Sequence, residues 1–336
     1  MRTVNQITIA AVGLAVLMSA SCIDTKKIAV KTTAQVLMMG QPALKQENDY
    51  EHAARALPGA LKTVESFHVA YPAIWRLTAV AAEGYCQYGT GFTEDEWEQA
   101  AWVDKDFDKS EYIAGRATKM FLRCMNYSLE WLGGDWAKVV MGPMDPLMAK
   151  LRGAGQGQRK QLLFTALGLA SAINMNKDKV EFIDMAGAAE NILKRLVVMD
   201  GEGKIFAGGK DFDQAAFDKL FGKPSGAPPK DPVERAYPHL ALGMLYTSRA
   251  EAIGGDPDQG KKHFERAIEL TGGKFLLAKV MYARNFGRIR QQRDFFRDTL
   301  VSVLQTDPAI YPQQRLANEI AHRRARRYLK LEKEWF

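Results

Sequence analysis

The chain has 336 residues, of which 47% are hydrophobic and 25% are charged. This composition is ordinary for a globular protein and excludes a small fold that needs a disulfide framework. The net charge of +7 would suit nucleic acid, anionic lipid or an acidic partner. The late arginines fall on expected helices without a nucleic-acid motif, so most of this charge is expected to be solvated surface. They are Arg284, Arg288, Arg290, Arg293, Arg297, Arg323, Arg324, Arg326 and Arg327.

The first 22 residues have the features of an export signal. Arg2 precedes an apolar stretch from Ile7 to Met18 that is too short to span a bilayer comfortably, and small residues lead to Cys22. The segment resembles a bacterial lipoprotein signal, although Ser19 stands where a large aliphatic residue is usual. We therefore predict a signal peptide at 1–22 and lipidation of Cys22. An ordinary secretory signal with an incidental Cys22 is the alternative, and export in either case argues against a nucleic-acid partner.

Two regions follow the signal. Residues 23–45 are predicted to be a polar tether with several lysines, and residues 46–336 a single helical domain. Apolar residues such as Leu57, Leu61 and Val64 recur at three- and four-residue spacing, and Gly and Pro clusters separate the helical stretches. This pattern predicts an all-α fold without a sheet.

The helices are expected to pair as hairpins of the tetratricopeptide type, which gives an α-solenoid. In the best-matching pair, Gly243 lies on the first helix, and Gly260, Phe264 and Ala267 lie on the second. Small residues let two helices approach closely, so these four positions predict a helix crossing. A helix from Tyr282 to Arg293 is expected next. Residues 201–236 are interpreted as a long loop that contains one short helix at 211–221.

No catalytic or metal-binding motif emerges from the chain. The five histidines do not form a metal-binding spacing, and the two later cysteines lie far apart. We therefore expect no enzyme activity, no metal and no cofactor. Cys86 and Cys124 lie in apolar helical surroundings and are expected to be free thiols, although export would permit a disulfide. The acids at Glu94, Asp95, Glu96 and Glu98 are interpreted as a helix start, where they favour the helix dipole.

Aromatic residues gather between positions 75 and 136, where five of the six tryptophans fall. Most are expected to be core, but Tyr85 and Tyr88 lie three residues apart on one helix face and are candidates for a cleft wall. The predicted cleft lies between this window and the Tyr282–Arg293 helix. Because arginine pairs well with carboxylates, it would suit an amphiphilic organic acid. The cleft candidates are Trp75, Tyr85, Tyr88, Tyr127, Tyr282 and Arg284. The alternative is that these aromatics only fill the core.

Three passages together resemble a known family. They are Glu51–Gly89, residues 237–284 with the Tyr-Pro-His-Leu-Ala-Leu-Gly segment, and the closing helix of residues 316–336 with Asn318 and Ala321. The chain resembles the TatT family, the tetratricopeptide-repeat lipoproteins associated with TRAP transporters. The family often carries tryptophan in its central helix, whereas this chain has none from Leu162 to Asn174. We therefore do not infer a ligand contact by aromatic residues of the central helix in this chain.

The resemblance implies a periplasmic protein that partners the solute-binding component of a TRAP transporter. It also implies a solenoid that can assemble into ring-like homo-oligomers with a pore, and a ligand that is a small organic acid or a hydrophobic molecule. Asn318 is then a structural residue of the closing helix. The competing hypothesis is an envelope scaffold lipoprotein that assembles other proteins. The two hypotheses differ in whether a continuous apolar cleft exists.

Overall fold

The computed structural model describes residues 24–177, 179–183, 185–206, 213–248 and 251–336. Within these residues the chain is helical and contains no strand, as the periodicity predicts. The predicted signal peptide and Cys22 lie outside them. The main helices are α2 (Thr25–Lys45), α3 (Tyr50–Ala70), α4 (Trp75–Tyr88), α5 (Glu94–Glu98), α6 (Phe107–Leu132), α7 (Trp136–Val140), α8 (Met144–Gly153), α9 (Arg159–Met175), α10 (Val180–Ile183), α11 (Ala186–Met199), α12 (Gln214–Phe221), α13 (Pro232–Ser248), α14 (Pro257–Leu270), α15 (Leu276–Tyr282), α16 (Arg293–Gln305), α17 (Arg315–Lys330) and α18 (Glu332–Trp335).

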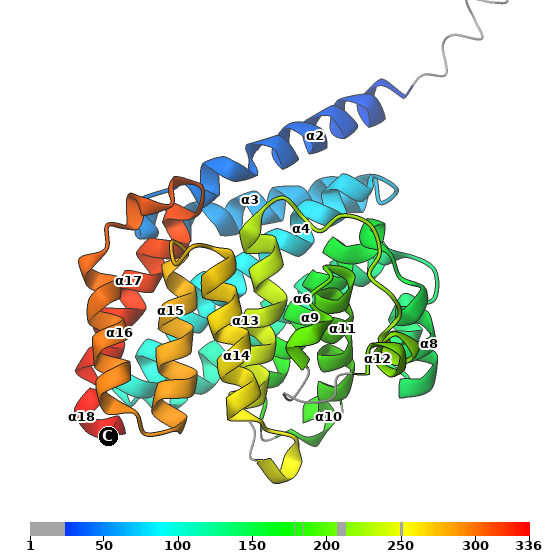
Figure 1. Cartoon of the computed structure of the whole chain (residues 1–336). Coiled ribbons are helices and arrows are strands. Elements are labelled where there is room, and N and C mark those ends of the chain that lie inside the picture. Colours follow the sequence, from blue (N-terminus) through cyan, green and yellow to red (C-terminus); the bar gives the residue numbers. More distant parts are fainter. Residues whose placement is uncertain (1–23, 178, 184, 207–212, 249–250) are drawn as a thin grey trace, which may run out of the picture.

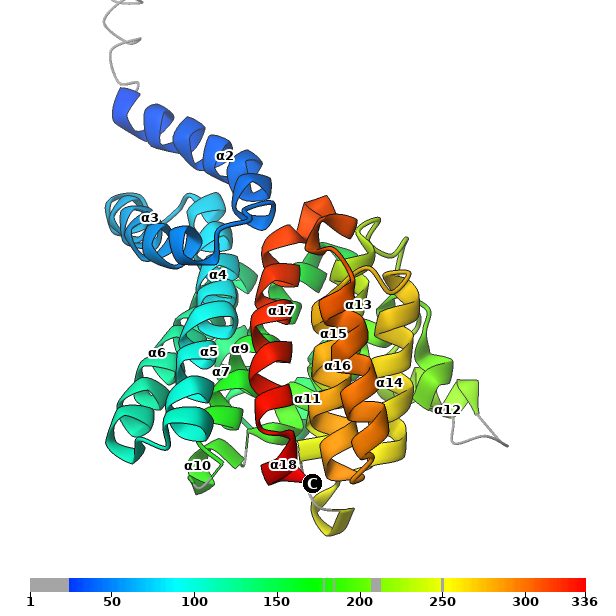
Figure 2. The same ribbon diagram turned by 90° about the vertical axis from the view of Figure 1, so that its left-hand side faces the viewer.

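The helices form two walls that face each other (Figures 1 and 2). Figure 2 shows α4, α5 and α6 on one side, α13 to α16 on the other, and α17 between them. The closing helix α17 packs on α15 and α16 and also contacts α2 and α3. The last part of the solenoid therefore returns to the first, and the space between the walls is surrounded by helices.

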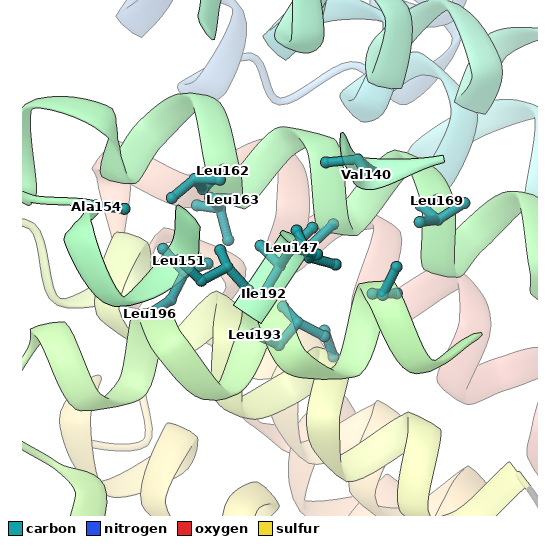
Figure 3. Close-up of a cluster of buried hydrophobic side chains, with 14 of the residues drawn as sticks. Val140, Leu147, Leu151, Ala154, Leu162, Leu163, Leu169, Ile192, Leu193 and Leu196 are labelled. Atoms are coloured by element: carbon teal, nitrogen blue, oxygen red, sulfur yellow. The ribbon is translucent and has the colours of Figure 1, made fainter. Parts of the chain in front are cut away.

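A leucine-rich core joins α8, α9 and α11, which lie between the two walls in chain order. It joins Leu147 and Leu151 of α8 to Leu162 of α9 and to Ile192 and Leu196 of α11, all of them fully buried (Figure 3). Burying a leucine side chain stabilises a fold by roughly 1.5–3 kcal/mol. This cluster holds α9 in place, so that its opposite face is free to line the space between the walls.

Helices α13 and α14 cross where four small or aromatic residues meet. A Cβ atom on Gly260 would lie 2.7 Å from Cγ2 of Thr247, and one on Gly243 would lie 3.0 Å from the Phe264 ring. Phe264 and Ala267 have no exposed surface. The two helices approach this closely because glycine leaves room for the facing side chains.

Asn318 joins α17 to the start of α15. Its Oδ1 accepts a hydrogen bond of 2.9 Å from the backbone N–H of Leu276, and its Nδ2 donates to the carbonyl oxygens of Lys274 and Pro308. The side chain is fully buried. One amide thus satisfies a backbone donor at the start of α15 that has no partner within the helix.

A buried histidine pair links α13 to α14. Nδ1 of His239 lies 2.9 Å from Nδ1 of His263, and Nε2 of His239 lies 3.1 Å from Glu202. One tautomer arrangement satisfies the set: the Gln259 amide donates to His263, His263 donates to His239, and His239 donates to Glu202. His263 is neutral in this arrangement. Burial and the neighbouring His239 lower the pKa of His263 well below its ordinary value of 6.5.

Two local expectations need revision. Residues 25–45, whose structure the sequence left open, form the helix α2, with Ala34 as its buried residue. The helix expected from Tyr282 to Arg293 is two elements: α15 ends at Tyr282 and continues as a π-helical turn (Ala283–Gly287), and Arg293 begins α16. Between them Gln291 adopts a φ of 51°. This left-handed residue reverses the chain.

The prediction of free thiols at Cys86 and Cys124 is wrong, because the two residues form a disulfide between α4 and α6. Their Cα atoms are 5.2 Å apart, within the range that a disulfide requires. The apolar surroundings noted in the sequence are real, since both residues are buried. Burial alone does not distinguish a free thiol from a disulfide. The packing of α4 on α6 brings the two cysteines close enough to bond.

Candidate ligand-binding cavity

An elongated cavity of about 350 Å³ lies between the two walls. Helix α13 lines it from Glu234 to Ser248, and α9 and the turn that follows line it from Leu163 to Lys177. With a rise of 1.5 Å per residue, each of these segments spans about 21 Å. The cavity is therefore a tube that runs along these two helices.

The middle of the tube is apolar. Helices on every side contribute apolar side chains to the lining. These are Phe92 after α4, Leu167 on α9, Leu240 and Met244 on α13, Leu277 on α15 and Ile320 on α17. Ligand sites in proteins are typically apolar with a few placed polar groups. This section can bind a hydrocarbon group but offers no set of groups for catalysis.

One end of the tube carries more carboxylates than cations. Glu83, Asp231 and Glu234 line it together with Lys45. Lys45 lies 2.7 Å from Glu83, and Lys160 bridges Glu83 and Glu234 at 2.9 and 3.5 Å. Burial would raise the pKa of Glu83, but Lys45 and Lys160 outweigh it and hold the pKa below its usual range. Even with Lys160 included, this end keeps an excess of negative charge.

The opposite end carries more cations than carboxylates. Lys177, Arg284 and Arg324 line it together with Glu94. Arg324 offsets Glu94, with 3.6 Å between guanidinium and carboxylate. Arg284 lies over the ring of Trp102 at 4.8 Å and, within the described residues, forms no ion pair. Partial burial and the neighbouring charge of Arg284 lower the pKa of Lys177. Positive charge therefore remains available at this end.

A buried ion cluster supports the cationic end from behind. Arg327 donates hydrogen bonds of 2.7 Å to both Glu98 and Asp95, and the hydroxyl of Tyr328 donates to Glu98 at 2.8 Å. Neither carboxylate has any exposed surface. Residues 94–98 do form the short helix α5, with acids in its first turn as the sequence predicted. Glu94, Asp95 and Glu98 are buried, however, and do more than favour the helix dipole. The three buried acids hold α5 against α17.

The sequence contained a signal for this cluster. The acids Glu94, Asp95 and Glu98 have spacings of one and four residues, and the arginines Arg323, Arg324 and Arg327 repeat that spacing with opposite charge. Two complementary sets at helical spacing are what two packed helices present to each other. The pairing lies more than 220 residues apart in sequence, so composition alone suggested only solvated arginines.

Of the six cleft candidates, Arg284 lines the cavity and the other five do not. Tyr85 stacks on Tyr127 with ring centroids 6.0 Å apart, and the Tyr127 hydroxyl donates to Glu65. Tyr88 packs beside Phe92. These three tyrosines lie in the packing of α4 with α3 and α6. The neighbouring residues Cys86, Gln87, Thr90 and Gly91 line the tube instead.

The remaining two candidates have other environments. Trp75 stacks on Trp131 and is 46% exposed at the surface. Tyr282 lies between Phe264 and Phe295, and its hydroxyl donates to Glu265. The sequence reasoning missed the aliphatic lining on α9 and α13, because those residues have the same composition as the core. The segment from Leu162 to Asn174, which lacks the family's tryptophan, supplies Leu163, Phe164 and Leu167 to the wall.

Comparison with protein-family models identifies the family of this chain. The model of the TRAP transporter T-component matches residues 46–229 and 233–336. The chain belongs to this family. A comparison with curated proteins finds no similar sequence.

The T-component is thus an accessory of a TRAP transporter, built as a helical solenoid around a tube. Among its described helices, none has the length and apolar character needed to cross a bilayer. In the same part of the chain, no group of three or more histidine, cysteine or acidic side chains is placed to hold a metal ion.

Proposed function

We propose that this T-component is a non-catalytic, lipid-anchored protein on the periplasmic side of a bacterial envelope. It binds the solute-binding component of its TRAP transporter, and its tube takes up a small amphiphilic ligand that the two proteins exchange. The observation that carries this proposal is the apolar tube with charged ends between the two walls of helices.

The tube favours exchange of a ligand over a pure scaffold role. A scaffold needs an outer surface for its partners but has no use for an internal tube. Filling such a space with side chains would stabilise the fold, because unfilled volume costs packing energy. The retention of the tube among the surrounding helices therefore supports a role in binding.

A binding experiment with the solute-binding protein of the same operon tests the proposal. The mature T-component would be immobilised through its N-terminus, and the solute-binding protein passed over it with and without its own ligand. A solute-binding protein from an unrelated transporter is the control. We expect saturable binding of the cognate partner alone. If neither loaded nor empty partner binds, the accessory role must be exerted without this contact, and the envelope scaffold becomes the better account.

Self-assembly is part of the same proposal, because the resemblance to the TatT family implies ring-like homo-oligomers. Mass measurement of the purified mature protein over a range of concentrations tests it. A single monomeric species at all concentrations would contradict it.

A further inference from the structure

We infer that the tube selects one kind of ligand: a long-chain monocarboxylate whose head lies at the Arg284 end and whose tail extends toward Glu234. This inference rests on the proposed function, since it names the ligand class for the same cavity. Three features of the tube carry it: its length, its apolar middle and the opposite charge of its two ends.

The length of the tube suits a long hydrocarbon chain. The lining runs for about 21 Å along α13, between Glu234 and Ser248. With C–C bonds of about 1.5 Å, an extended palmitate chain spans roughly 20 Å and octanoate roughly 9 Å.

The charges at the two ends select the direction of the ligand. A ligand carboxylate at the C-terminal end of α13 meets Arg284 and Lys177, while the third cation, Arg324, is ion-paired with Glu94. Arginine binds carboxylates in a planar, two-bond geometry. A carboxylate at the other end would meet Glu83, Asp231 and Glu234. The same asymmetry excludes a long-chain dicarboxylate, whose second charge would be forced into the acidic end.

Glu94 competes with the ligand for the same cations. It is buried beside Arg324 on the cavity wall, and Arg284 is close enough to influence its ionisation. Burial raises the pKa of Glu94, while Arg324 opposes that rise. When Glu94 is ionised it reduces the positive field at the head site. Removing its charge should therefore strengthen carboxylate binding.

Calorimetry with a ligand series below micellar concentrations tests the inference. The probes are octanoate, laurate, palmitate, hexadecanedioate and the short dicarboxylate succinate. We expect affinity to rise with chain length by up to about fourfold for each added methylene that enters the tube. Hexadecanedioate should bind more weakly than palmitate, and succinate should not bind. Equal affinity for palmitate and hexadecanedioate would overturn the assigned direction.

Charge variants test the head site. Arg284→Gln should weaken palmitate binding by roughly tenfold to hundredfold, whereas Glu94→Gln should strengthen it. Arg290→Gln is the matched control, because Arg290 is exposed on the same segment and pairs with Asp258 outside the tube. If Arg284→Gln and Arg290→Gln bind palmitate alike, Arg284 does not receive the head group.

A plug variant tests the path of the tail. Leu167 lines the tube about 15 Å along the α9 side from Lys177, by the helical rise. Leu167→Trp should abolish palmitate binding but leave octanoate binding, since the short chain ends before the plug. Loss of both ligands in a variant that retains the wild-type circular dichroism spectrum would contradict the path. Binding of the solute-binding protein is measured on the same variants, so that a wrong ligand and a wrong partner give different results.

Discussion

The buried ion cluster allows a sharp test of what holds α5 to α17. Arg327 neutralises Asp95 and Glu98 through two hydrogen bonds of 2.7 Å, and both carboxylates are fully buried. Arg327→Met keeps the length of the side chain but leaves Glu98 without its ion pair at 2.7 Å, while Asp95 keeps only Arg323 at that distance. Breaking a buried ion pair by removing one member typically costs 3–5 kcal/mol.

The structure places the expected cost near the lower end of that range. Arg324 remains 3.7 Å from Asp95 and 3.8 Å from Glu98, and Tyr328 still donates to Glu98. We therefore expect the free energy of unfolding to fall by about 3 kcal/mol. That is a large part of the 5–15 kcal/mol typical of a folded domain. Urea unfolding followed by circular dichroism measures the loss.

The matched control is Arg326→Met on the same helix, where the arginine is exposed. It should change the unfolding free energy by less than about 0.5 kcal/mol. Equal unfolding midpoints for the two variants would refute the claim that Arg327 stabilises the buried acids.

The dependence on pH adds a second check. In the wild type, burial would raise the pKa of Asp95, but Arg324 and Arg327 outweigh it and depress the pKa below its ordinary 3.8. Its stabilising contribution is therefore present above that value and is lost as the pH falls through the lower, folded-state pKa. Without Arg327, a buried acid can take up a proton and become neutral at higher pH. The difference between variant and wild type should thus shrink on acidification from pH 7 to pH 5, and a constant difference would contradict this account.

Four further predictions follow from other parts of the molecule. Gly260→Leu should lower the unfolding free energy by about 1–3 kcal/mol by overpacking the α13–α14 crossing, whereas Gly115→Ala, where a Cβ meets nothing within 4 Å, should not; equal thermal midpoints would contradict the crossing. Because the pKa of His263 is depressed in the folded state, stability should fall as the pH drops below the unfolded value of 6.5, and His263→Gln should flatten the part of that slope which His263 contributes. Replacing Cys86 and Cys124 by serine should cost about 3–4 kcal/mol, since the bond closes a loop with a sequence separation of 38 residues; an unchanged urea midpoint would show that the bond adds nothing. Finally, Cys22→Ala should release the protein from membranes, and wild-type fractionation of this variant would disprove the lipid anchor.

The sequence alone determined the helical class and the family. Helix periodicity and Gly or Pro breaks are local signals, read within a window of a dozen residues. The crossing residues Gly260, Phe264 and Ala267 also belong to a single hairpin whose helices follow each other in the chain. Most of these features involve residues that are near each other in sequence, which is why a pattern could reveal them.

Tertiary structure decided everything that joins distant segments. The disulfide, the pairing of α5 with α17 and the tube all depend on which helix faces meet, and neither composition nor spacing encodes that choice directly. Core and cavity walls use the same aliphatic residues, so Leu167 and Leu240 could not be distinguished from buried filler, while the tyrosines chosen for their hydroxyls proved to face α3 and α6. Arg284 was the exception, because it was chosen for a charge that can pair with a carboxylate and not for its apolar character.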